Sequence, residues 1–131
     1  MDFPRALLFI VDNTDQEIFT QAIQLCKFFK SQLFVLFVLE EHRIVKLASI
    51  THKHIDSIKR KIEEEGWEML YLIEDEAVEN GVRTSLHLEN GVVTKIIRRY
   101  LENYKINLIL TKKREETKKI FVSSPVPVIG L

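Results

Sequence analysis

The chain has 131 residues, of which 46% are hydrophobic, and this length and composition predict one compact domain over residues 1–131. Lysine plus arginine and aspartate plus glutamate each number 19, so no net field of either sign attracts nucleic acid or a membrane surface. Its longest apolar runs, residues 6–11 and 33–39, are far shorter than the roughly 20 residues of a membrane helix. With no export signal and a single cysteine, Cys26, the sequence predicts a cytoplasmic protein.

The first third of the chain alternates between buried strands and a helix. Residues 6–11 (ALLFIV) form a continuous apolar run, which is typical of a parallel strand covered on both faces. Thr14 and Glu17 have capping-box spacing and predict the start of a helix that runs to Phe29. Residues 32–39 (QLFVLFVL) predict a second buried strand.

The middle of the chain predicts a long helix. Residues 42–54 carry no clear period, whereas an apolar stripe with helical spacing begins at Ile55 and ends before Asn80 and Gly81. We therefore expect one long helix that is irregular at its start. Residues 67–73 (WEMLYLI) could form a strand, but acidic flanks and the absence of turn residues before them favour the helix.

The last third continues the alternation. Residues 82–88 predict a third strand, with Asn90 and Gly91 as a turn before a helix over residues 92–104. Residues 107–111 predict a fourth strand and residues 126–131 a fifth. Strands that alternate with helices form a parallel α/β sheet covered on both faces.

Four local motifs resemble those of the universal stress protein family, and together they cover nearly the whole chain. They are residues 11–14 (VDNT), 38–40 (VLE), 88–91 (LENG) and the closing segment 124–129 (SPVPVI), which is similar to the family's Ala-Pro-Cys-Pro-Val-Leu strand. The resemblance implies a Rossmann-like, doubly wound sheet of five parallel strands in the order 3-2-1-4-5. It also implies a dimer.

One motif of that family is missing from this sequence. In ATP-binding members the fourth strand leads into Gly-x-x-Gly, nine further residues and Gly-Ser/Thr, whose backbone N–H groups hold the phosphates. Residues 112–124 number only 13 here and contain no glycine, so the loop is absent and the last crossover helix must be short. We therefore expect no bound cofactor, with ATP as the alternative.

A ligand crevice is nevertheless expected where the winding of the sheet reverses, between the first and fourth strands. The residues expected to line it are Asp12, Asn13, Thr14, Thr111, Lys112 and Lys113. The resemblance adds Val38 as a wall of an adenine pocket beside Asp12. The alternative is structural: Asp12 caps the turn, Val38 belongs to the core, and the lysines form a solvated surface run.

Catalytic and metal sites are not predicted. His52 and His54 are two residues apart on a helix, so they do not face one way, and no metal-ligand spacing is present. No histidine is placed beside Cys26, and Ser123 and Ser124 lack a nucleophile-elbow pattern.

The fifth strand is predicted to lie at an edge of the sheet. Pro125 and Pro127 are two residues apart, so their missing N–H groups would face the same side, and proline within a sheet is found on edge strands. Such an apolar edge must be covered, which predicts a homodimer through Val126, Pro127, Val128 and Ile129. The first functional hypothesis is thus a non-catalytic regulatory or stress-response module that acts as a homodimer with an unknown protein partner. The second is an adenine-nucleotide-binding switch or slow ATPase that uses Lys112 or Lys113.

Overall fold

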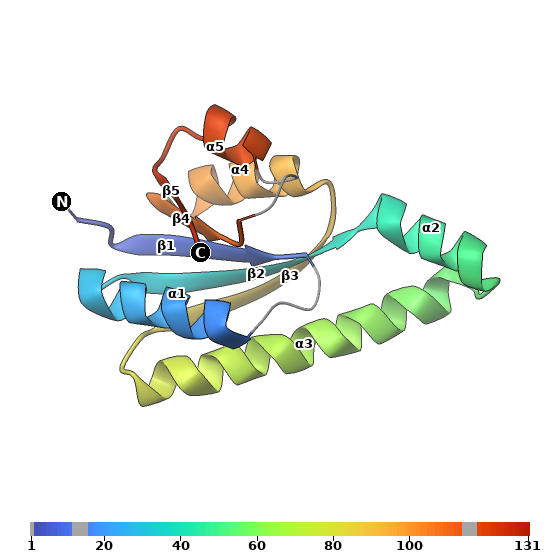
Figure 1. Ribbon diagram of the computed structural model, residues 1–131, viewed down its shortest axis with the longest axis horizontal. Coiled ribbons are helices and arrows are strands. Elements are labelled where there is room, and N and C mark those ends of the chain that lie inside the picture. The colour runs from blue at the N-terminus through green and yellow to red at the C-terminus, as the bar shows by residue number, and fades with distance from the viewer. Residues whose placement is uncertain (1, 12–15, 114–117) are drawn as a thin grey trace.

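The computed structural model of the protein describes residues 2–11, 16–113 and 118–131. Five parallel strands form one sheet in the order β3-β2-β1-β4-β5, with helices on both faces (Figure 1). The expected doubly wound fold class and strand order are therefore confirmed. The strands are β1 (Arg5–Ile10), β2 (Gln32–Glu40), β3 (Thr84–Gly91), β4 (Leu108–Thr111) and β5 (Val128–Gly130).

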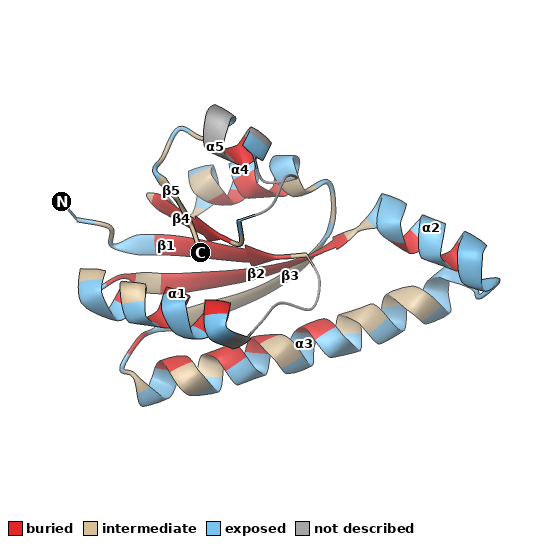
Figure 2. Ribbon diagram, in the orientation of Figure 1, coloured by how far each residue is buried: buried red, intermediate tan, exposed pale blue. Residues whose placement is uncertain are grey.

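The sheet separates two apolar layers. Along β1, Ala6, Leu8 and Ile10 pack into the layer that holds α1 (Gln16–Phe29) and α3 (Ile55–Glu79). Leu7 and Phe9 pack into the opposite layer with α4 (Val93–Asn103) and α5 (Lys118–Ser123). Because successive side chains of a strand point to opposite faces, both faces must be covered, and Figure 2 shows the buried strands between the two helical layers.

The long helix is confirmed, and the segment before it is a second helix that the sequence pattern did not predict. α3 includes residues 67–73, so the helical interpretation of that segment holds. Residues 42–54 contain most of α2 (Glu41–Thr51), which ends at His52 with a left-handed φ of 56°. α2 buries only Ile44 and Ala48, and one pair at i, i+4 is too little for a recognisable period.

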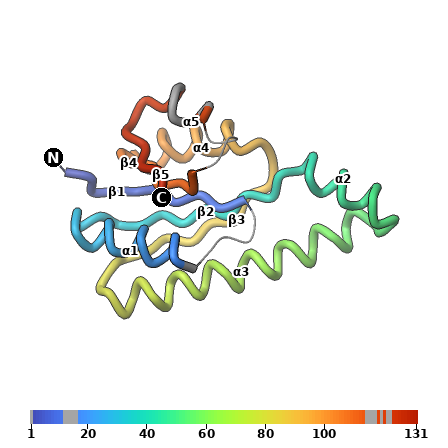
Figure 3. Tube along the Cα trace, in the orientation of Figure 1, coloured from blue at the N-terminus to red at the C-terminus, as the bar shows by residue number. Residues whose placement is uncertain are grey.

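α2 and the first part of α3 extend beyond the carboxyl ends of the strands (Figures 1 and 3). Further along α3, Gly66 lies against the sheet so closely that an added Cβ would be 2.9 Å from Phe37 Cδ1 and 3.2 Å from Leu88 Cδ1. The helix can therefore lie this close to Phe37 and Leu88 because position 66 has no side chain. No helix of the described residues is both long enough and apolar enough to span a membrane.

Two sequence predictions are corrected. Asn90 and Gly91 are not a turn: they end β3 and pair with Leu39 and Glu40, and Gly91 takes a φ of 144° that favours glycine. β5 begins at Val128 rather than at residue 126. The short α5 agrees with the expected shortening of the last crossover, whereas the capping residue Thr14 lies outside the described residues.

Candidate functional site

The crevice was predicted at the carboxyl ends of β1 and β4, and these two strands do pair directly at the point where the winding reverses. Val11 follows β1 there, while Asp12, Asn13 and Thr14 lie outside the described residues. Thr111 ends β4 with 1% of its surface exposed, and its Oγ1 donates to the Lys112 carbonyl oxygen at 3.3 Å. Thr111 thus offers almost no surface to a ligand.

The backbone after β4 is already paired. The Lys113 N–H donates to the Leu131 carbonyl oxygen at 3.3 Å, and the Leu131 N–H donates to the Thr111 carbonyl oxygen at 2.8 Å. Lys112 is half-buried and Lys113 is exposed. The structure therefore brings Thr111, Lys112 and Lys113 together with the chain that follows β5.

Val38 is not on the surface of the crevice. It is fully buried within β2, pairs with Glu89 of β3, and packs in the layer that contains α4 and α5. In this conformation its side chain contacts the core, so an adenine ring could reach it only if neighbouring side chains moved.

A hollow of about 530 Å³ opens next to Val11, between the carboxyl end of β2 and the two helices α2 and α3. Its apolar lining comes from Val11, Phe37, Leu39, Ile44, Leu47, Ile50 and Ile62, and its polar lining from Glu40, His42, Arg43, Lys46 and Glu65. Glu40 Oε2 is 3.6 Å from Arg43 Nε and 3.7 Å from His42 Nε2. An apolar hollow with charges of both signs suits a small molecule that carries both an apolar body and a charged group.

Sequence reasoning missed this hollow because α2 forms one of its walls. Its polar lining residues His42, Arg43 and Lys46 belong to no motif that the sequence analysis identified. The spacing of Ile44, Leu47 and Ala48 is the one local signal of this wall, and it covers too few residues to establish a helical period.

A second polar cluster lies between β3 and α4, and the sequence analysis did not identify it. The His87 ring lies 5.1 Å from the Tyr100 ring and 5.2 Å from the Tyr104 ring, and His87 Nε2 is 2.8 Å from Ser85 Oγ. Burial lowers the pKa of His87, although the nearby carboxylate of Glu89 opposes this shift.

Glu89 joins the same cluster to α4. Its Oε2 accepts from Arg99 Nη2 at 2.6 Å and from the Tyr100 hydroxyl at 2.8 Å. Burial, together with the hydrogen bond to Glu89, raises the pKa of Tyr100. The arrangement attaches α4 to the edge strand, and no buried side-chain nitrogen or oxygen of the described residues lacks a hydrogen-bond partner.

The described residues contain no group of three or more histidine, cysteine, aspartate or glutamate side chains that could hold a metal ion. Cys26 is buried in the layer with α1 and α3, and burial raises the pKa of its thiol to about 12. A thiol in this environment is a poor nucleophile.

The fold is shared with solved universal stress protein structures. A universal stress protein family structure from Burkholderia pseudomallei matches with a TM-score of 0.81 and 13% identity, over 98% of this chain and 96% of that one. The universal stress protein UspA from Lactobacillus plantarum matches with a TM-score of 0.72 and 16% identity, over 100% and 99%. A family protein from Arabidopsis thaliana with AMP bound matches with a TM-score of 0.64 and 10% identity, over 97% and 90%.

These matches define the class: the chain has the fold of universal stress proteins over its whole length. The resemblance that the sequence motifs indicated is thus confirmed at the level of the fold. No protein-family model matches the sequence, and no curated protein does.

Proposed function

We propose that this protein is a non-catalytic, universal-stress-protein-like regulatory or stress-response module that acts as a homodimer and does not bind ATP. The single observation that carries the proposal is the connection from β4 to β5. It spans residues 112–127, with 13 residues before Pro125, contains no glycine, and includes the six-residue α5. Phosphates need closely approaching backbone N–H groups, which side chains in such a segment obstruct.

The dimer part of the proposal is supported by the outer edge of β5. The Ile109 N–H donates to the Pro127 carbonyl oxygen at 3.0 Å, and the Leu131 N–H donates to Thr111. Since backbone groups alternate along a strand, Val128 and Gly130 direct theirs away from β4. No other strand of the described residues pairs with that edge.

Val126 contributes less to this edge than the sequence suggested. Ser124 Oγ donates to the Val126 carbonyl oxygen at 2.7 Å and accepts from the Val126 N–H at 3.2 Å. Both backbone groups of Val126 are therefore occupied within the chain. We place the pairing of two subunits at Val128 and Gly130, with Pro127 and Ile129 facing β4.

Two measurements test the proposal. Titration calorimetry with ATP and Mg²⁺ should give no binding heat at millimolar ATP, and mass spectrometry of natively purified protein should find no retained nucleotide. Sedimentation equilibrium should show a dimer for the wild type and a weakened dimer for Val128→Lys. Retained nucleotide would reject the first part, and a monomer at high micromolar concentration would reject the second.

The alternative function is an adenine-nucleotide-binding switch or slow ATPase at the β1/β4 crevice. It is favoured by the AMP bound in the Arabidopsis thaliana structure of the same fold. In that case Lys112→Ala or Lys113→Ala should weaken the binding of ATP, whereas Lys95→Ala, an exposed lysine of α4, should not. Release of inorganic phosphate would then separate a hydrolase from a switch.

A further inference from the structure

We propose that the hairpin tip formed by α2 and the start of α3 docks on an anionic membrane surface, with aliphatic side chains in the interface and lysines against the lipid headgroups. The hairpin tip is defined as residues 41–61, which comprise α2, the connection to α3 and the first turns of α3. This inference is independent of the proposed function, because the hairpin tip includes no residue of β5 or of the connection from β4 to β5.

The hairpin tip projects from the sheet. α2 and the first part of α3 extend beyond the carboxyl ends of the strands (Figures 1 and 3). His52 ends α2 with a left-handed φ of 56°, and the Ile58 N–H donates to the His54 carbonyl oxygen at 3.2 Å where α3 begins. Lys53 therefore lies at the apex between two helices. A projection of this kind can reach a flat surface before the rest of the protein does.

The hairpin tip is the basic part of a neutral chain. It contains six lysine or arginine residues and only two aspartate or glutamate residues, so it has a net charge of +4, and the remaining residues carry −4. A charge balance over the whole chain does not report this separation. Basic clusters on exposed helices are typical of segments that bind anionic lipids. The six basic residues are Arg43, Lys46, Lys53, Lys59, Arg60 and Lys61.

One of these charges is partly offset by a residue just before the hairpin tip. Glu40 Oε2 is 3.6 Å from Arg43 Nε, so this pair contributes little net charge. With Glu40 included, the net charge is +3. Lys46 and Lys53 are both exposed and are the lysines that the apex can present to a membrane.

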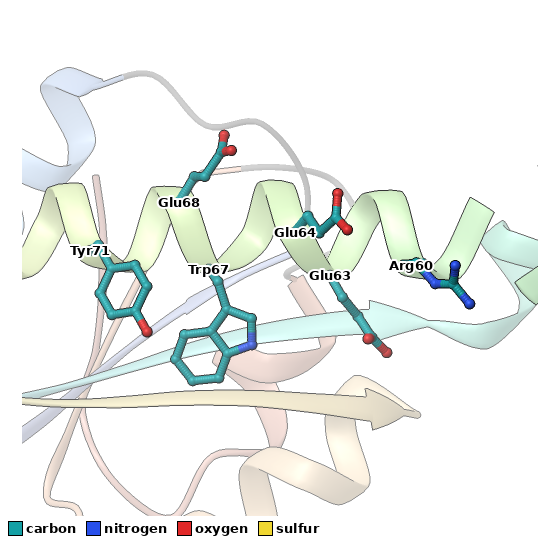
Figure 4. Close-up of a pocket in the computed structure, with 6 residues that line it drawn as sticks. All are labelled: Arg60, Glu63, Glu64, Trp67, Glu68 and Tyr71. Atoms are coloured by element: carbon teal, nitrogen blue, oxygen red, sulfur yellow. The ribbon is translucent and has the colours of Figure 1, made fainter. Parts of the chain in front are cut away.

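The charge of α3 determines how the hairpin tip can approach. Beyond Arg60 the helix carries carboxylates on two sides, those of Glu63, Glu64 and Glu68 (Figure 4). A membrane that lay along the flank of α3 would meet these carboxylates and be repelled. A membrane that meets the apex contacts Lys53 first. The approach is therefore apex first.

Aliphatic side chains are exposed on the same hairpin tip. Ile44 and Ala48 are the buried residues of α2, whereas Val45 and Ile50 are 50% and 65% exposed, and Ile55 at the start of α3 is 47% exposed. Aliphatic groups beside lysines suit the boundary between headgroups and acyl chains. The isoleucines leave water there, while each lysine keeps its stem in the apolar layer and its ammonium group near the phosphates.

The composition of the hairpin tip favours lipid over nucleic acid. It contains no phenylalanine, tyrosine or tryptophan, so the bases of a single strand would find no ring on which to stack. Exposed isoleucine gains little from a sugar–phosphate backbone, whereas a lipid interface removes it from water. An anionic bilayer is thus the partner that uses both the charges and the aliphatic groups.

The test is co-sedimentation of the full-length protein with lipid vesicles. We expect binding to vesicles of phosphatidylcholine with about one-third phosphatidylserine, and little binding to phosphatidylcholine alone. Added salt should weaken the binding, because it screens the attraction between lysines and lipid headgroups. Absence of binding to the anionic vesicles at low salt, or equal binding to both kinds of vesicle, would overturn the proposal.

Matched variants identify the contacts. Lys46→Gln and Lys53→Gln should each weaken binding about fivefold, the loss expected for one lysine near an anionic surface. Ile50→Ser should weaken it several-fold, because a polar side chain gains nothing from the interface. Lys27→Gln, an exposed lysine of α1, and Val78→Ser, 68% exposed near the end of α3, should bind as the wild type does. Circular dichroism confirms folding, and equal effects of tip and control variants would reject the hairpin tip as the docking surface.

Tryptophan fluorescence tests the orientation. Trp67 is the only tryptophan and extends from α3 beside the carboxylates, so its emission should not change when vesicles bind (Figure 4). In the double variant Ile55→Trp, Trp67→Phe, the emission should shift to shorter wavelength with anionic vesicles. A shift of Trp67 in the wild type without one in the double variant would reject the apex-first approach. Displacement of the protein from the vesicles by a single-stranded oligonucleotide would overturn the proposal, because it would assign the hairpin tip to nucleic acid.

Discussion

The substitution Val128→Pro tests the pairing of two β5 strands more sharply than a change of side chain. Val128 directs its N–H away from β4, so proline removes a group that the fold of one subunit does not use. The folded structure should therefore survive. The dimer, in contrast, should lose a donor from each subunit.

The geometry sets the expected magnitude. If two β5 strands pair antiparallel about a two-fold axis, Val128 of each subunit faces Gly130 of the other, and about four hydrogen bonds form. The substitution removes about two of them, and each contributes about 1 kcal/mol net, so the dimer loses about 2 kcal/mol. The dissociation constant should rise about 30-fold.

Sedimentation equilibrium over a range of protein concentrations measures this constant, and circular dichroism confirms that the variant remains folded. Val128→Ala is the matched control, because it shortens the side chain but keeps the N–H. Its dissociation constant should change much less than that of Val128→Pro. Equal effects of the two variants, or a monomeric wild type, would refute the role of the β5 backbone.

Three further predictions concern the interior. Gly66→Ala should gain about 1 kcal/mol from helix propensity but lose about 1–3 kcal/mol by overpacking against Phe37. Urea unfolding should therefore show that the free energy of unfolding falls by about 1 kcal/mol. A variant more stable than the wild type would contradict the close packing at this position. Because the pKa of His87 is lowered in the folded state, its contribution to stability is present above pH 6.5 and declines as the pH falls through the folded value. The variant His87→Phe keeps a ring but cannot titrate. Its urea midpoints at about pH 7.5 and about pH 5.5 should therefore differ less than those of the wild type. If the difference were the same in both proteins, His87 would be excluded as the cause of the lower stability at acidic pH. Burial raises the pKa of Cys26 to about 12. A disulfide reagent at neutral pH should therefore label the thiol of the native protein at least about 100-fold more slowly than that of the urea-unfolded protein. Rapid labelling of the native protein would show that the thiol is accessible.

Most of the fold could be predicted because its signals are local. The continuous apolar runs of β1 and β2 and the long stripe of α3 each report their own burial, and the alternation of strands and helices implies a parallel sheet. α2 escaped prediction because only Ile44 and Ala48 are buried, so its pattern resembles that of a polar loop.

The candidate site was less accessible to sequence reasoning. Thr111 and Lys112 were correctly assigned to the carboxyl end of β4, yet Thr111 proved buried by packing that no local pattern reports. The cluster of His87 with Tyr100 and Tyr104 joins residues of β3 and α4 that are adjacent only after both elements pack.

The sequence by itself determined the class of fold, the absence of glycine between β4 and β5, and the alternation of the two prolines near β5. These features depend on residue type and spacing along one segment. The tertiary structure alone decided that β3 continues through Gly91, that Ser124 occupies the backbone groups of Val126, and that α2 lines a hollow next to Val11. Each of these depends on pairing, side-chain hydrogen bonds or packing between particular residues, which spacing along the chain does not specify.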